Sequence, residues 1–146
     1  LDFCKQLDYK PVLFSAFQDV NSKRLPIYHT NVMMCVAKDF AVVCLDAIDS
    51  QIERANVINS LEESNKEIIE ISEFQANKFA GNMLQVKGDK LYLIMSKSAF
   101  ESLSSLQINK IRSYSEILSV DLEIIEKCGG GSARCMMAEI FLPLKK

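Results

Sequence analysis

The sequence predicts an α/β fold made of repeated strand–strand–helix–strand units. Short apolar runs of strand length alternate with stretches of helical period, and the same order of elements returns about 50 residues later. Two sets of segments carry matching motifs: 31–34, 82–84 and 134–137 at the first strand of a unit, and 66–72 with 115–121 at its last strand. We therefore expect a single domain over residues 1–146, whose units span roughly 26–72, 73–121 and 122–146.

Composition and charge exclude several classes of protein. Hydrophobic residues make up 49% of the chain and charged residues 25%, which is typical of a globular domain with its own core. The net charge of −2 and the scattered basic residues argue against a nucleic-acid partner. No apolar run approaches the roughly 18 residues that span a bilayer. We expect neither nucleic acid nor a membrane among the partners.

The five cysteines indicate a reducing compartment, so we expect the protein in the cytoplasm. Their number is odd, their spacing is irregular, and no Cys-x-x-Cys pair occurs. The nearest pairs, Cys35 with Cys44 and Cys128 with Cys135, lack the spacing of zinc ligands, and His29 is the only histidine. The sequence therefore predicts no structural metal site.

The apolar pattern predicts the elements of both units. Before and within the first unit we expect strands at 10–17, 25–36, 40–45 and 66–71, a helix at 48–61, and a polar turn at 18–24. In the second we expect helices at 73–79 and 98–114 and strands at 82–87, 91–96 and 116–122, followed by a short helix at 123–127 and a strand at 135–142. The strands at 25–36 and 40–45 are expected to pair as a hairpin.

The stretch 127–139, KCGGGSARCMMAE, carries the clearest chemical signal. Three successive glycines precede Cys135, and glycine tolerates positive φ and lets other groups approach the backbone. This pattern predicts a bend that presents a thiol at the mouth of a strand. Arg134 immediately precedes the thiol, and a nearby cation stabilises the reactive thiolate. The alternative is an inert cysteine beside a glycine-rich turn, with Arg134 as a surface side chain.

His29 and Cys135 together form the minimum set for nucleophilic catalysis by cysteine. The thiolate attacks, and an imidazole with an unperturbed pKa near 6.5 moves protons at neutral pH. Both residues fall at or near equivalent strand starts in different units. Because equivalent positions of a pseudo-symmetric ring converge on its axis, residues far apart in the chain can meet there. The alternative for His29 is a satisfied, partly buried histidine.

Three segments of the chain resemble the guanidino-group-modifying superfamily, the penteins. They are YHTNVMM at 28–34, FAGNML at 79–84 and GGGSARCMMAE at 129–139. A Gly-Gly pair shortly before the nucleophilic cysteine, and a histidine that opens a strand much earlier in the chain, are the most specific signatures of the superfamily. Within it, the three segments are most similar to the bacterial citrulline-utilisation hydrolases and amidinotransferase-like proteins, and the Arg-Cys-Met triplet resembles the arginine deiminases.

The resemblance implies a fold and a set of partners. Superfamily members form a five-bladed α/β propeller of ββαβ units, and complete members are longer, so we expect this chain to be the C-terminal half of such a propeller. The chain begins at Leu1 rather than Met, which also suggests a fragment. The missing N-terminal half, or a second copy in a homo-oligomer, is therefore an expected partner. The acidic residue that orients the histidine is expected upstream of Leu1.

The resemblance also implies roles for five residues. Cys135 is the expected nucleophile and His29 the expected acid and base, with no metal ion or organic cofactor. Asn31, Asn82 and Arg134 are the expected substrate-binding residues, although the two asparagines could instead cap local turns. Deiminases commonly carry a carboxylate at the position of Asn31. A neutral amide holds a guanidinium less strongly, which leaves room for the ureido group of citrulline.

The implied function is hydrolysis of the guanidino or ureido group of an arginine- or citrulline-like small molecule through a covalent thiouronium-type intermediate. Two alternatives stay open: an amidinotransferase that passes the amidino group to an amine, and a non-catalytic binding protein with the same fold. The presence of both Cys135 and His29 at the motif positions argues against the binding protein.

Overall fold

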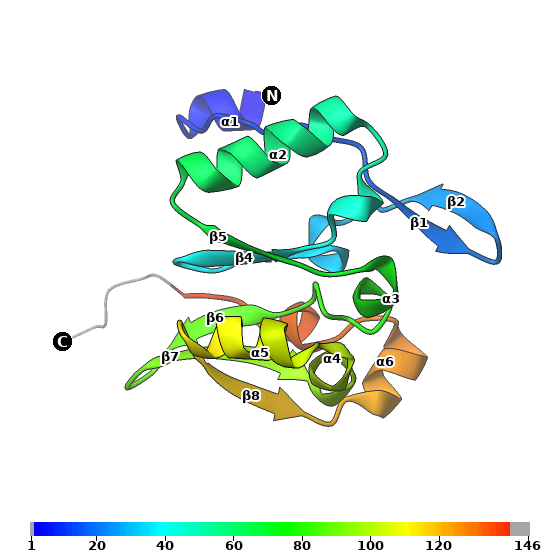
Figure 1. The fold of residues 1–146 in the computed structure, drawn as a ribbon, viewed down its shortest axis with the longest axis vertical. Helices are drawn as coiled ribbons and strands as arrows, with labels where there is room; N and C mark the ends of the chain where they lie inside the picture. The colour runs from blue at the N-terminus through cyan, green and yellow to red at the C-terminus, as the bar shows by residue number, and fades with distance from the viewer. Residues whose placement is uncertain (1, 141–146) are drawn as a thin grey trace.

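The computed structural model describes residues 2–140, which form two three-stranded sheets, a separate hairpin and several helices (Figure 1). The strands are β1 (Phe17–Val20), β2 (Lys23–Pro26), β3 (Met34–Val36), β4 (Phe40–Val43), β5 (Glu67–Glu70), β6 (Leu84–Lys87), β7 (Leu91–Ser96) and β8 (Glu116–Val120). The α-helices are α1 (Asp2–Gln6), α2 (Gln51–Glu63), α3 (Glu73–Ala76), α4 (Lys97–Ser102), α5 (Ser105–Arg112) and α6 (Glu123–Gly129). Short 3-10 turns lie at η1 (Thr30–Val32), η2 (Leu45–Ala47) and η3 (Ala133–Met136). Within residues 2–140, no helix has the length and apolar character needed to cross a membrane.

The two three-stranded sheets have the same topology. β3 pairs antiparallel with β4, and β4 pairs parallel with β5, with α2 as the crossover. β6, β7 and β8 repeat this arrangement, with α4 and α5 in the crossover. A parallel neighbour requires such a crossover, because a tight turn joins only antiparallel strands. The predicted α/β class and the strand–strand–helix–strand order are confirmed, whereas the partial propeller stays a prediction.

One hydrophobic core joins the two units. Buried side chains of both sheets belong to a single cluster, among them Phe40 and Ile69 in the first unit and Leu93 and Met95 in the second. The ring of Phe40 also stacks on that of Tyr114 in the second unit, with centroids 5.4 Å apart. In Figure 1 the second sheet lies beneath the first, which α2 covers from above. Since these side chains leave water only when the sheets pack together, each unit stabilises the other.

Two hydrogen-bonded glutamines of the second unit lie at its junction with the first. Gln75 and Gln107 each occupy the third position of a capping box, whose N-caps are Ser72 and Ser104. The Nε2 of Gln75 donates to the Oε1 of Gln107 at 2.8 Å, and the Nε2 of Gln107 donates to the Glu70 carbonyl at 2.6 Å. The residues that begin two helices therefore also connect them.

The segment before the first unit differs from the prediction. Residues 10–16 of the predicted strand 10–17 contain no strand, and the polar stretch 18–24, expected as a turn, contains most of the β1–β2 hairpin. Asn21 and Ser22 turn this hairpin with φ of 50° and 60°, the left-handed conformation that matches the twist of paired strands. The apolar run 10–17 signalled burial rather than strand pairing, because Phe14 packs against the core from a loop.

Two predicted elements are interrupted by capped turns. The predicted strand 25–36 is broken by η1, which separates β2 from β3. The predicted helix 98–114 is two helices, because Ser104 caps a new helix and bonds reciprocally with Gln107. The hairpin expected from 25–36 and 40–45 is present as the pair β3–β4.

The predicted strand 135–142 is wrong over the residues that the structure describes. Cys135 lies in η3, and residues 137–140 form no strand; residues 141–142 lie outside the described part of the chain. Met136 is 51% exposed and Ile140 80% exposed, so no sheet face buries this apolar run. Hydrophobicity alone therefore misassigned the segment, since strands also need a hydrogen-bonding neighbour.

Candidate active site

Cys135 lies on the 3-10 turn η3, where it is exposed. Gly130 has a φ of 66° and ends α6 in the left-handed conformation, which glycine adopts without steric cost. A Cβ added at Gly131 would lie 3.2 Å from the Cβ and 3.3 Å from the Sγ of Cys135. The bend predicted from the glycine run is therefore present at Gly130, and the missing side chain at Gly131 leaves space for the Cys135 thiol.

The side-chain amide of Asn82 contacts the thiol and joins three of the predicted site residues. Its Nδ2 lies 3.2 Å from the Sγ of Cys135 and donates to the Asn31 carbonyl at 3.1 Å. Its Oδ1 accepts the backbone N–H of Arg134 at 3.0 Å. Asn82 is only 3% exposed, so these contacts form away from water, where an unpaired amide is costly.

Gly81 brings Asn82 to this position. A Cβ at Gly81 would lie 2.7 Å from the carbonyl carbon of Met33 and 2.7 Å from the carbonyl oxygen of Val32, distances that Cβ atoms essentially never show. The two segments pass this closely only because glycine has no side chain. The chain just before β6 therefore lies against the end of η1, the turn that carries Asn31.

His29 is exposed and caps the first turn of η1. Its Nδ1 accepts the backbone N–H of Asn31 at 3.4 Å, a long hydrogen bond. Within residues 2–140, the other ring nitrogen, Nε2, forms no hydrogen bond. The ring of Tyr28 lies edge-on to the imidazole with centroids 6.3 Å apart. A capped turn, and not the predicted strand start, positions this side chain.

The thiol and the imidazole line two adjoining pockets. Cys135 lines a pocket of about 230 Å³ together with Asn31 and Asn82. His29 lines a pocket of about 290 Å³ together with Asn31 and Arg134. Asn31 forms part of the wall of both. The structure therefore brings His29 and Cys135 to neighbouring pockets on either side of Asn31, and not into one pocket.

The side chain of Arg134 lies on the histidine side of the site. Its guanidinium lies 3.4 Å from the Oε2 of Glu139, and both residues line the pocket of His29. Cys35 lines the same pocket, and burial raises the pKa of its thiol to about 12, from an ordinary value of 9.0. Cys35 is therefore a neutral thiol near pH 7 and is buried, whereas Cys135 is exposed.

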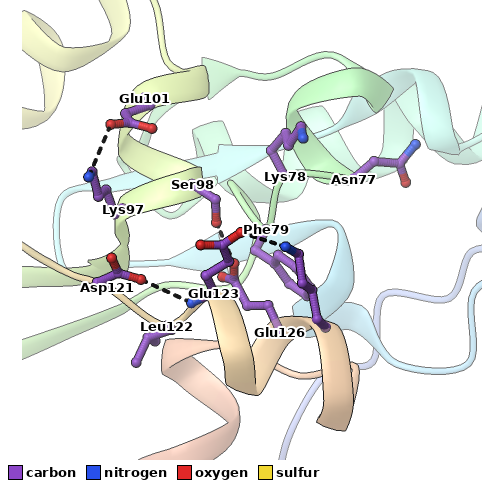
Figure 2. Close-up of a pocket in the computed structure, with 11 residues that line it drawn as sticks. Asn77, Lys78, Phe79, Lys97, Ser98, Glu101, Asp121, Leu122, Glu123 and Glu126 are labelled. Carbon is purple, nitrogen blue, oxygen red and sulfur yellow. Dashed lines mark hydrogen bonds and ion pairs between the residues drawn. The ribbon is translucent and has the colours of Figure 1, made fainter.

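A larger pocket, of about 420 Å³, adjoins that of the thiol, and Asn77 and Phe79 line both. Charged side chains of α4 and α6 surround it (Figure 2). One of them, Glu126, accepts hydrogen bonds from Ser98 and Ser132. Sequence reasoning identified none of these residues, since no periodic pattern relates a helix carboxylate to a serine in the following loop. Among residues 2–140, no three His, Cys, Asp or Glu side chains are grouped so as to hold a metal ion.

Comparison with known proteins gives one family and one solved structure. A family model described as N,N dimethylarginine dimethylhydrolase, eukaryotic, matches residues 1–142. The structure is that of apo ArgZ, an arginine dihydrolase from the ornithine-ammonia cycle in Cyanobacteria, with 21% sequence identity and a TM-score of 0.63. The match covers 92% of this chain and 19% of the ArgZ chain, and at this identity it speaks to the fold alone. No curated protein matches the chain.

Proposed function

Because the chain belongs to the eukaryotic N,N dimethylarginine dimethylhydrolase family, we propose that it forms part of a cysteine-dependent hydrolase of guanidino or ureido groups. The family lies within the guanidino-group-modifying superfamily that the sequence motifs resemble. Its name specifies dimethylarginine, and the matched structure is titled an arginine dihydrolase. Arginine, its methylated forms and citrulline all present a planar carbon bonded to nitrogen, and this carbon is the proposed point of attack.

The observation that carries the proposal is the pair of contacts made by the Asn82 amide. Through it the Cys135 sulfur lies one side chain away from Asn31, which is two residues beyond His29. The thiol and the imidazole therefore belong to one connected group of residues, although 105 residues separate them in the sequence. Such a group, beside two pockets, supports nucleophilic catalysis better than a surface cysteine in isolation.

The proposed reaction has two steps. In the first, the Cys135 thiolate forms a bond to the central carbon, the carbon–nitrogen bond breaks, and a proton from the His29 imidazolium goes to the departing amine. A thiouronium-type adduct then remains on sulfur. In the second step, water attacks the same carbon while His29 takes its proton, and the carbon–sulfur bond breaks to regenerate the thiolate. Cysteine supplies the covalent chemistry, so the proposed mechanism uses no metal or organic cofactor.

The neighbouring polar groups suggest how the substrate binds. Within residues 2–140, no hydrogen bond engages the side-chain amide of Asn31, which lines both pockets and is free to bind the planar group. Asn82 would contact the sulfur rather than the substrate. The Arg134 guanidinium would bind a substrate carboxylate in competition with Glu139. The proposed enzyme is cytoplasmic, and the acid that orients His29 would come from the rest of the protein or from a second copy.

Alkylation by 2-chloroacetamidine, a small reagent that carries an amidine, tests the proposal. We expect Cys135 to react faster than the other exposed cysteine of this region, Cys128, and an arginine- or citrulline-like ligand to protect it. Cys135→Ser should abolish the labelled product, and Cys128→Ser should leave it unchanged. Equal reaction of both cysteines, with no protection by any such ligand, would contradict the enzymatic function and favour a binding protein.

Product analysis separates hydrolysis from transfer. A hydrolase releases ammonia or an alkylamine from the substrate in the absence of any acceptor amine. An amidinotransferase gives no such release until an acceptor is added. We expect release without an acceptor, measured with the complete protein, and dependence on an acceptor would reassign the reaction.

A further inference from the structure

We infer that Glu126 is a positioning residue, which holds the loop of Cys135 against the second unit and so determines where the thiol lies. This role rests on the proposed function of Cys135. The Oε1 of Glu126 accepts a hydrogen bond from the Ser132 hydroxyl at 2.6 Å, and the Oε2 accepts one from the Ser98 hydroxyl at 2.6 Å. Short hydroxyl-to-carboxylate bonds are charge-assisted and roughly twice as strong as neutral ones. Figure 2 shows the bond to Ser98.

Ser132 connects the Glu126 carboxylate to the turn that carries the thiol. Its side chain is fully buried, and its carbonyl accepts the backbone N–H of Cys135 at 3.0 Å, the bond that closes η3. The carbonyl of Glu126 itself accepts the N–H of Gly130, so backbone and side chain of one residue hold both ends of the loop 130–132. A shift of Ser132 would therefore shift Cys135.

Ser98 connects the carboxylate to the protein interior. Its hydroxyl lies 3.0 Å from that of Ser96, which is fully buried at the end of β7 and caps α4 through the N–H of Ala99. The carboxylate thus bridges a buried helix start and the loop of the thiol. Within residues 2–140 it forms no ion pair, in contrast to Glu123, which pairs with Lys127 on the same helix.

The test compares variants that break this link with a matched carboxylate that does not form it. Ser132→Ala and Glu126→Ala break the link, the first without any change of charge, and Glu126→Gln keeps one acceptor oxygen. Glu123→Gln neutralises a carboxylate of the same helix and pocket and serves as the control. The readout is the rate of iodoacetamide alkylation of Cys135 against pH, resolved by mass spectrometry, with Cys128 as internal reference.

We expect Ser132→Ala and Glu126→Ala to lower the Cys135 rate at neutral pH by about fivefold relative to that of Cys128, because the sulfur moves away from its contact with the Asn82 amide. Glu126→Gln should give an intermediate profile, and Glu123→Gln that of the wild type. If either alanine variant fails to fold, Ser98→Ala, which breaks the outer end of the link, replaces it.

Wild-type profiles in both alanine variants would overturn the inference. An equal change at Cys135 and Cys128 would attribute the effect to α6 as a whole, and would also overturn it. Failure of the proposed function has a different signature: the wild-type Cys135 then shows no preference for 2-chloroacetamidine, whatever the variants do with iodoacetamide.

Discussion

A single side chain, that of Asn82, connects parts of the candidate site that come from distant points of the chain. Its amide reaches Cys135, Asn31 and the backbone of Arg134, and it is almost fully buried. One buried amide forms all of these contacts, so its removal would affect each of the groups that it contacts. This residue therefore contributes both to stability and to the position of the thiol.

Two substitutions of Asn82 separate these contributions. Asn82→Ala leaves the Asn31 carbonyl without its partner and the Arg134 N–H with only the longer bond to the Asn82 carbonyl, at 3.4 Å. We expect the free energy of unfolding to fall by about 1–3 kcal/mol. Asn82→Asp places a carboxylate beside the sulfur, so alkylation of Cys135 should require higher pH. Urea unfolding and pH-dependent alkylation measure the two effects. Asn59→Ala, on the exposed face of α2, is the control; comparable losses in both alanine variants would contradict a special role for Asn82.

Burial of Cys35 predicts a loss of stability in alkali. Desolvation raises the pKa of its thiol in the folded protein to about 12 from 9.0, so the folded state prefers the neutral form. The contribution of the neutral Cys35 thiol to the free energy of unfolding is complete below pH 9. It declines as the pH rises towards 12, by at most about 1.4 kcal/mol per pH unit. Urea unfolding between about pH 8.5 and 10 should show a shallower decline in Cys35→Ala than in the wild type. Identical slopes would disprove the assignment.

At the scale of elements, two backbone segments approach each other closely beside the candidate site. The chain just before β6 packs directly on the end of η1, and only glycine at position 81 permits this distance. The contact links the first strand of the second unit to the turn of His29 and Asn31. Capped turns then decide where the elements begin, as Ser50 does for α2 and Ser104 for α5.

Gly81→Ala should therefore be among the most destabilising single changes in the chain. The added methyl would meet backbone atoms of η1 and β3 that cannot move aside, and we expect a loss of about 3 kcal/mol or more in the free energy of unfolding. Gly129→Ala is the matched control, because nothing lies within 4 Å of its added Cβ and it ends a helix. The control should be neutral or slightly stabilising. Equal stability of the two variants would refute the close approach.

For the molecule as a whole, ion pairs attach the β1–β2 hairpin to the body, from which it projects in Figure 1. Arg24 on β2 bonds to Asp49 at 2.7 Å and to the Asp46 carbonyl at 3.0 Å, and it pairs with Glu73 at the start of α3. The hydrogen bond to Arg24 lowers the pKa of the Asp49 carboxyl below its ordinary value of 3.8. The hairpin carries Gln18, which lines the thiol pocket, so this attachment bears on the site.

The sign of this pKa shift predicts an acid-sensitive attachment. A carboxyl whose pKa is lowered on folding contributes stability above its ordinary pKa, and this contribution disappears as the pH falls through the lowered value. Below about pH 4 we expect amide hydrogens of the hairpin to exchange faster relative to those of the sheets. Arg24→Met should show the faster exchange already at pH 7, and a hairpin protected equally in both proteins would argue against the ion pairs.

The exposed edge of the second sheet predicts association. β8 is the last strand of its sheet, and Leu118 and Val120 on it are each nearly half exposed. Apolar edge strands pair readily with other chains. We expect light scattering of residues 1–146 alone to detect dimers or larger species, and Val120→Lys to reduce them. A stable monomer would contradict both this expectation and the proposed need for a partner.

How far the sequence predicts the molecule can be seen at particular residues. Apolar periodicity placed β4, β5, β7 and β8 correctly. Side chains on one face repeat every two residues in a strand and about every 3.6 in a helix, so the spacing of buried apolar residues indicates which element forms. The same signal failed at 10–16 and at 135–140, the described part of the predicted strand 135–142, where the apolar residues lie outside strands. Motif resemblance selected Cys135, His29, Asn31, Asn82 and Arg134, but neither it nor the repeat predicted which of these side chains contact one another.

By itself the sequence determined the α/β class, the repeated units and the residues that form the candidate site, since composition, period and motif are properties of neighbours along the chain. Only the tertiary structure decided that Asn82 lies between the thiol and Asn31, that Arg134 lies beside Glu139, and that Glu126 holds the loop of Cys135. The contacts of Asn82 join segments that lie 51 and 53 residues apart in the chain. They depend on how two sheets pack and on a backbone approach at Gly81, and no local pattern encodes either.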